Sequence, residues 1–189
     1  DRCERTEVAL ENAALGPAAI SDDGERVAVL VQEPATSKVV MGVFDRDGVS
    51  ILSVEGAGVA RAGPVLSADG STLALTVHCE GDSVCPRVMS LDGAGATLPR
   101  PRENFALWLA ASADLRRVVV GGSRQTALWS PSSGGHRYLE GDLSLGYPMP
   151  VSDDGASALA NVSDALEGVP ESTVRRYDLA SGRLSSPLG

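Results

Sequence analysis

The chain has 189 residues, of which 43% are apolar and 22% charged, a balance that excludes an intrinsically disordered protein. Its net charge is −9, and it lacks the clustered basic residues that a nucleic-acid partner requires. No apolar run reaches the ~18 residues of a membrane-spanning helix, so the sequence predicts no membrane span.

One short phrase occurs four times: an apolar run, a Ser-x-Asp turn, and a second run rich in residues that favour strands. The turn serines are Ser21, Ser67, Ser112 and Ser152, so the steps are 46, 45 and 40 residues. A period of roughly 40–50 residues built from short strands is typical of β-propeller blades. The sequence therefore predicts an all-β fold, a β-propeller or propeller segment, with four blades of four-stranded antiparallel meanders.

The elements of the first blade can be followed in chain order. Residues 17–21 are predicted to form the inner strand, and Asp22-Asp23-Gly24 the turn after it, because Asx side chains bond the backbone and glycine allows positive φ. Residues 27–31 predict a strand buried on both faces. Residues 39–44 and 50–54 complete the blade.

The same plan recurs along the whole chain. A single domain over residues 1–189 is predicted, with blades at about 16–55, 56–98, 99–140 and 141–189. Leu115 takes the place of the turn glycine in the third unit, which predicts a different turn type there. The fourth unit is predicted to have the longest loop between its second and third strands, at about residues 161–172.

The segment before the first blade is predicted to be one more strand. Residues 5–11 precede Gly16-Pro17 as residues 51–54 precede Gly63-Pro64, so they match the outer strand of a preceding or closing blade. Three alternatives follow: a segment of a longer propeller, a closed ring of four or five blades, or a ring completed by a second copy. An open sheet edge invites the last of these. The strand residues concerned are Thr6, Glu7, Val8, Ala9 and Leu10.

Two of the three cysteines belong to one predicted hairpin. Cys79 and Cys85 are separated by five residues, with strand-like sequence on either side. A disulfide across the hairpin is the preferred interpretation, and it implies an oxidising compartment. A metal site with His78 and a pair of free thiols are the alternatives, although the spacing differs from that of zinc sites. Cys3 has no evident partner in the sequence.

The turn motifs resemble those of the TolB-like and WD-repeat-like propeller family, in which the first hairpin turn is Ser-Pro-Asp-Gly. Ser67-Ala68-Asp69-Gly70 matches this motif with the proline replaced, and Tyr177-Asp178-Leu179-Ala180-Ser181-Gly182 resembles the family's later segment. The resemblance covers residues 16–189 and implies the propeller fold. The absence of the WD-repeat Gly-His signature favours the bacterial, TolB-like side, as does a composition with one lysine and many Arg, Ala and Gly.

Polar residues on the loops that would share one face of the propeller are the candidate binding residues. These are Arg61, Arg102, Asn104, Arg124, Tyr147, Asp164 and Glu167. Ordinary solvated loop polarity is the alternative explanation for each of them. Trp108 and Trp129 are interpreted as packing residues, and His136 as a solvated histidine on an outer turn.

The sequence holds no catalytic motif. It has no G-x-S-x-G elbow, phosphate loop or H-E-x-x-H, and Asp45-Arg46-Asp47-Gly48 departs from the calcium-loop pattern. No catalytic residue, metal ligand or cofactor is therefore predicted. The leading hypothesis is a non-enzymatic interaction or scaffold module outside the bacterial cytoplasm, binding a protein or peptide or associating with itself. The alternative is the propeller domain of an extracytoplasmic hydrolase or lyase whose catalytic part lies elsewhere.

Overall fold

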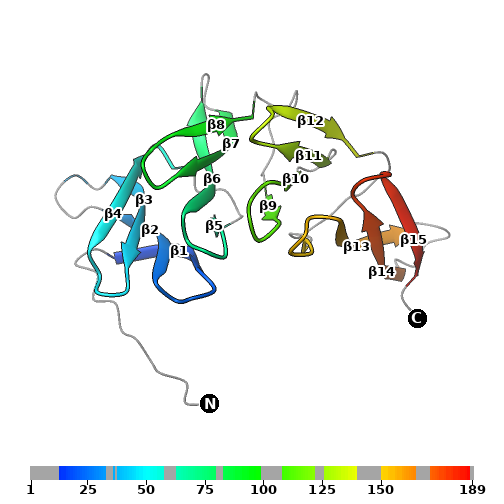
Figure 1. Ribbon diagram of the computed structural model, residues 1–189, viewed down its shortest axis with the longest axis horizontal. Coiled ribbons are helices and arrows are strands. Elements are labelled where there is room, and N and C mark those ends of the chain that lie inside the picture. The colour runs from blue at the N-terminus through cyan, green and yellow to red at the C-terminus, as the bar shows by residue number, and fades with distance from the viewer. Residues whose placement is uncertain are drawn as a thin grey trace, which may run out of the picture.

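The computed structural model describes residues 13–32, 36, 38–57, 63–79, 83–98, 108–121, 126–139, 150–164 and 171–187. These residues form β-strands and turns, and none of them is helical. The strands form four antiparallel sheets arranged as successive blades along an arc (Figure 1). The predicted all-β propeller fold is confirmed.

Each blade is a meander whose strands follow chain order. Blade 1 consists of β1 (Ala13–Ile20), β2 (Arg26–Gln32), β3 (Val39–Asp45) and β4 (Ser50–Glu55). Blade 2 consists of β5 (Val65–Leu66), β6 (Thr72–Cys79), β7 (Ser83–Ser90) and β8 (Gly95–Thr97). Blade 3 consists of β9 (Trp108–Ala111), β10 (Val118–Gly121), β11 (Thr126–Ser130) and β12 (Gly135–Tyr138).

In blade 4 the described residues form three strands, β13 (Ser157–Asp164), β14 (Glu171–Asp178) and β15 (Arg183–Pro187). A single bridge between Val151 and Ala158 stands where the other blades have their inner strand. The predicted long loop at residues 161–172 is wrong, because β13 and β14 stay paired as far as Asp164 and Glu171. The alternating side chains of this segment suit a long antiparallel ladder better than a loop.

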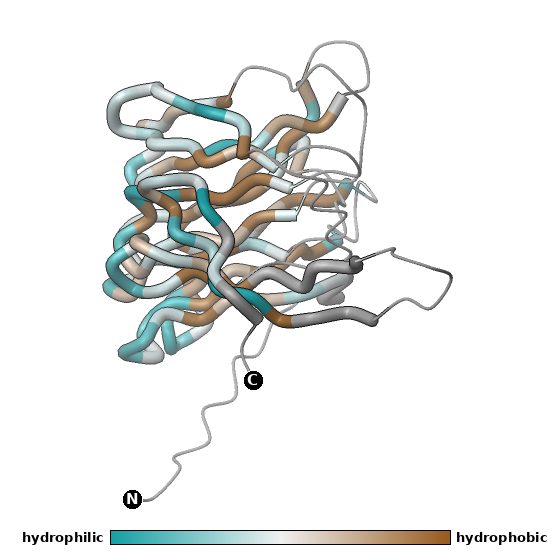
Figure 2. Tube along the Cα trace, turned by 90° about the vertical axis from the view of Figure 1, so that its right-hand side faces the viewer, coloured by the Kyte–Doolittle hydropathy of each residue, from teal (hydrophilic) through white to brown (hydrophobic). Residues whose placement is uncertain are grey.

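The hydrophobic core lies between successive blades. One cluster joins blade 1, with Leu30 and Val43, to blade 2, with Leu73 and Leu75. Two further clusters join blade 2 to blade 3 and blade 3 to blade 4 in the same way. Figure 2 shows apolar residues along the middle of the strands and hydrophilic residues at the turns. Both faces of an inner blade are therefore buried against the neighbouring blades.

Candidate functional site: the ends of the blade array

The Ser-x-Asp turns are built by a repeated set of hydrogen bonds. In blade 2, the Ser67 hydroxyl donates to the Asp69 carboxylate (2.6 Å) and accepts from the Thr72 N–H (3.0 Å). Asp69 also accepts from the N–H and the hydroxyl of Ser71 (3.0 and 2.8 Å). The Ser67 and Ser71 bonds lower the pKa of Asp69 from 3.8 to about 2. This arrangement fixes the turn, so these paired polar residues are structural.

The other three turns repeat the arrangement. Their serine hydroxyls donate to Asp23, Asp114 and Asp154 at 2.6, 2.8 and 2.7 Å, and the pKa of each carboxyl is lowered. Hydrogen bonds from Ser21 and Ser152 are the largest cause for Asp23 and Asp154, and the Arg116 N–H is the largest for Asp114. Carboxylates held ionised in this way are poorly suited to act as general acids or bases near neutral pH.

The turns also join the blades through the backbone. The Asp22 N–H donates to the Ala68 carbonyl (3.0 Å), the Ala68 N–H to the Ala113 carbonyl (2.8 Å), and the Ala113 N–H to the Asp153 carbonyl (3.2 Å). Every bond has the same direction, from one blade to the next. Among the described residues, the series begins at Asp22 and ends at Asp153.

A size-matched pair of residues lies at each junction. The partners are the fifth residue after the turn serine and the fourth turn residue of the next blade. A Cβ on Gly70 would lie 2.6 Å from Arg26 Cγ, and one on Gly155 would lie 2.6 Å from Arg117 Cγ. Arginine in one blade is thus matched by glycine in the next. At the middle junction the residues at these two positions are Thr72 and Leu115, so there the larger residue belongs to the second blade.

The prediction of a different turn type at Leu115 is wrong. Leu115 has φ of 53°, in the left-handed region, and its N–H donates to the Ser112 carbonyl as the Gly70 N–H does to Ser67. A leucine pays a backbone strain of ~1–2 kcal/mol in this conformation. The Leu115 side chain is buried with Ala74, Val88 and Leu98 of blade 2, and this burial offsets the strain.

The outward face of blade 4 lacks the cover that the other blades have. Leu159 is the seventh residue after its turn serine and is 40% exposed, whereas the corresponding Ala28, Ala74 and Val119 are each 0% exposed. Val174 is 47% exposed, although Met41 and Thr126 at the same position of other blades are 3% and 2% exposed. We call this surface, centred on Leu159 and Val174, the end face.

Blade 1 has a corresponding opening at its turn. Ile20 is 63% exposed, whereas Leu66, which precedes the turn serine of blade 2, is 8% exposed. A Cβ on Gly24 would have no atom within 4 Å, in contrast to Gly70 and Gly155. We call this surface, consisting of Ile20 and the turn at Gly24, the start face. Val29, Val31, Val40 and Phe44 lie on the same blade and are already buried.

Sequence reasoning missed both faces. A signal was present in the repeat. The seventh residue after each turn serine is covered by the following blade, and in the last copy this residue is the apolar Leu159. The predicted loop residues Arg61, Arg102, Asn104, Arg124, Tyr147 and Glu167 lie outside the described residues, as do residues 5–11. Asp164 ends β13 and pairs with Glu171 in the β13–β14 ladder.

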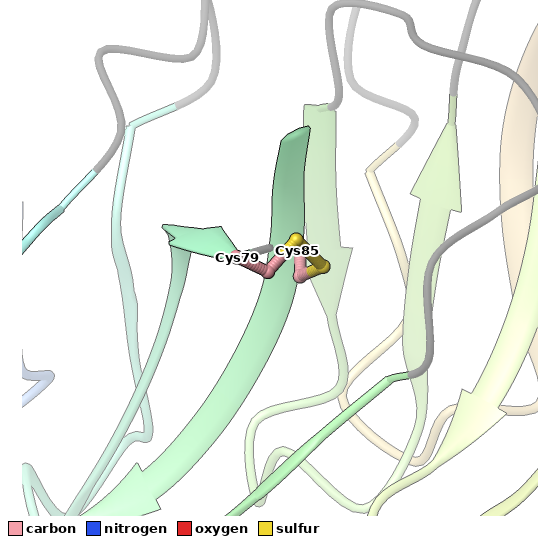
Figure 3. Close-up of a disulfide and its surroundings, with 2 residues drawn as sticks. All are labelled: Cys79 and Cys85. Atoms are coloured by element: carbon pink, nitrogen blue, oxygen red, sulfur yellow. A yellow bond between two sulfur atoms is a disulfide. The ribbon is translucent and has the colours of Figure 1, made fainter. Parts of the chain in front are cut away.

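The predicted disulfide is confirmed. Cys79 and Cys85 lie near the end of the β6–β7 hairpin, with their Cα atoms 6.0 Å apart and their sulfurs bonded (Figure 3). A bonded pair offers no thiolate to a metal ion, so the alternative of a metal site with His78 is wrong. In the part of the chain that the structure describes, no group of three or more His, Cys, Asp or Glu side chains is placed to hold a metal ion.

The aromatic residues have the packing roles predicted for them. Trp129 is buried in the cluster between blades 2 and 3. Trp108 is buried between blades 3 and 4, and its ring lies so close to Gly121 that any side chain there would overlap it. His136 is exposed and meets the Tyr138 ring edge-on at 5.8 Å between centroids.

The fold is similar to that of several solved structures. TolB from Acinetobacter baumannii matches 92% of this chain with a TM-score of 0.63 and 17% identity, and a putative TolB from Agrobacterium tumefaciens matches 90% with a TM-score of 0.62 and 14% identity. The chain has a TolB-like β-propeller fold. A chain of a nidogen/laminin complex is also similar, with 88% of this chain covered, a TM-score of 0.58 and 16% identity.

These similarities establish the fold only, because all three identities are low. The TolB-like blades span 43% and 61% of the two TolB chains and 60% of the chain from the nidogen/laminin complex. No family model matches the sequence. No curated protein matches it either. Among the residues described, no helix is long and apolar enough to cross a membrane.

Proposed function

We propose that this chain is a non-enzymatic protein-interaction module, and that the end face of blade 4 is a contact surface. The observation that carries the proposal is the exposure of Leu159 at a position that is fully buried in the three other blades. Covering Leu159 and Val174 would contribute roughly 1 kcal/mol each, because each is close to half exposed. A chain of similar fold was solved in a complex of nidogen and laminin, which supports a role in binding proteins.

The disulfide supports a site of action outside the cytoplasm, in an oxidising compartment. A bacterial source remains our prediction from composition. Self-association through an edge strand, with Thr6–Leu10 as the segment concerned, also remains a prediction. Deleting residues 1–10 is then expected to change the mass in solution or the melting temperature, and an unchanged mass and melting temperature would refute the edge-strand hypothesis.

Site-specific photo-crosslinking tests the end face directly. A benzophenone amino acid at position 159 of the purified chain, alone and in extract of the producing cells, is expected to form an adduct with a protein of defined mass. The matched control is the same amino acid at Tyr138, which is similarly exposed but lies on the outer strand of blade 3. No adduct at position 159, or equal adducts at both positions, would refute the proposal.

A further inference from the structure

A small pocket lies on blade 3, beside the turn between β14 and β15 of blade 4. Its volume is about 240 Å³, below the ~300–1,000 Å³ of pockets that hold drug-sized molecules, so it has room for one small polar group. The residues that line it are Arg117, Leu128, Ser130, Gly135, His136 and Arg137. Both arginines carry a positive charge and none of the lining residues is acidic, so we call this site the basic pocket.

The two arginines are held at the edges of the basic pocket by neutral acceptors. Arg117 Nη1 donates to the Ser130 hydroxyl at 2.9 Å. Arg137 Nη2 donates to the carbonyls of Leu179 and Ala180 in the blade 4 turn, at 2.9 Å to the second of them. A guanidinium has five N–H donors in a rigid fork, so these bonds position each arginine and leave most of its donors to a ligand.

Neither arginine forms an ion pair with a carboxylate of the described residues. The ion pairs there join Lys38 to Glu55, Arg46 to Glu25 and Arg116 to Asp114. Asp178, which begins the blade 4 turn, accepts instead from the N–H groups of Ala180 and Ser181 at 2.9 and 2.6 Å. A bound anion would therefore supply the negative charge that the two pocket arginines lack.

The outer turn of blade 3 lacks the carboxylate that the other blades have there. The turn between the last two strands of each other blade holds an aspartate that accepts a backbone N–H at 2.9–3.0 Å, namely Asp45, Asp92 and Asp178. Residues 130–135 of blade 3 are Ser-Pro-Ser-Ser-Gly-Gly and include no acidic residue. Arg26, at the position of Arg117 in blade 1, pairs across the sheet with Asp45. The turn of blade 3 is therefore without the charge that would repel an anion.

We propose that the basic pocket binds a phosphate group, either as free inorganic phosphate or as a phosphate ester. One guanidinium fork already matches the two oxygens of a carboxylate, whereas the further oxygens of a phosphate can meet both arginines at once. The Ser130 hydroxyl accepts from Arg117 and donates to no acceptor among the described residues, so its proton is available to the anion. His136 supplies a ring N–H. The inference goes beyond the end face, because neither Leu159 nor Val174 lines this pocket.

The experiment titrates inorganic phosphate into the full chain and follows the backbone amide signals by NMR, with the ionic strength held constant by chloride. The wild-type chain is expected to show saturable shifts. Arg117→Gln and Arg137→Gln keep part of each aliphatic stem and should raise the dissociation constant about tenfold, the effect of losing one charge-assisted hydrogen bond. Ser130→Asp, which introduces the residue found at this position in blades 1 and 4, should abolish binding.

Arg26→Gln is the matched control, because it removes the same charge from the same repeat position of blade 1. Its dissociation constant for phosphate should match that of the wild-type chain. Thermal unfolding of each variant reports whether the fold is kept. Ser130→Asp, on an outer turn whose counterparts hold aspartate, serves if an arginine variant fails to fold.

A second titration, with O-phosphoserine, separates the two sources of the phosphate group. Tighter binding of the ester than of the free ion would point to a phosphorylated ligand, and equal or weaker binding to the free ion; both results support the basic pocket. No saturable shift with either compound would overturn the proposal. Unchanged binding by Ser130→Asp would overturn it too, as would an equal loss in Arg26→Gln and Arg117→Gln, because binding would then follow net charge.

Discussion

The size-matched pairs predict a coupling between Thr72 and Leu115 that stability measurements can detect. Leu115→Gly removes a buried leucine, which costs ~2–5 kcal/mol, and relieves a left-handed strain of ~1–2 kcal/mol. The net loss is therefore about 2 kcal/mol at the midpoints of these ranges, which together allow roughly 0–4 kcal/mol. Thr72→Arg introduces a large side chain into a filled junction, which costs a further ~1–3 kcal/mol.

The double variant is expected to lose less free energy of unfolding than the two single variants lose together. Thr72→Arg with Leu115→Gly recreates the combination of Arg26 with Gly70 that joins blades 1 and 2. A favourable coupling of ~0.5–3 kcal/mol is typical of contacting residues. In urea unfolding at pH 7, the loss for the double variant should then be ~0.5–3 kcal/mol smaller than the sum of the two single losses.

A remote pair provides the control for this cycle. Thr72→Arg combined with Tyr138→Ala, which is exposed on another blade, is expected to be additive within ~0.5 kcal/mol. Additive losses for Thr72 and Leu115 as well would show that the two positions are independent. The size pairing would then be wrong.

Three further predictions concern the turns, the disulfide and blade 4. The pKa of Asp69 is depressed to about 2 in the folded state, so its contribution to stability is present above pH 3.8 and is lost as the pH falls toward 2. Asp69→Asn should therefore make the free energy of unfolding less dependent on pH in this window, and an unchanged pH dependence would contradict the role of the turn. Replacing Cys79 and Cys85 by alanine should cost roughly 2 kcal/mol by loop-closure entropy, seen as a lower urea midpoint, and an unchanged midpoint would count against it. Tyr177→Phe leaves the Gly182 carbonyl, 2.8 Å from the Tyr177 hydroxyl, without that donor, so the melting temperature should fall by ~2–6 °C, whereas no change would show that water replaces the bond.

The repeat made most of the fold predictable. Serine and aspartate in the turn have one low-energy arrangement with the backbone, so the copies at Ser21 and Ser67 identify the same hairpin wherever they occur. The turn type at Leu115 was mispredicted because local backbone preference was given more weight than burial of its side chain against the neighbouring blade. The length of β13 was mispredicted because it depends on pairing with β14, whose paired residues lie 7 to 21 positions further along the chain.

The candidate contact surface needed the structure for a different reason. A sequence repeat assigns the same environment to every copy, so Leu159 looks like the buried Ala28, Ala74 and Val119. Its environment differs because burial at this position comes from the next blade and not from its own. A polar residue at position 159 would be typical of an array that ends in a capping repeat. Leucine at this position instead leaves an apolar side chain 40% exposed on the outward face of blade 4, which is the physical argument for the proposed contact surface.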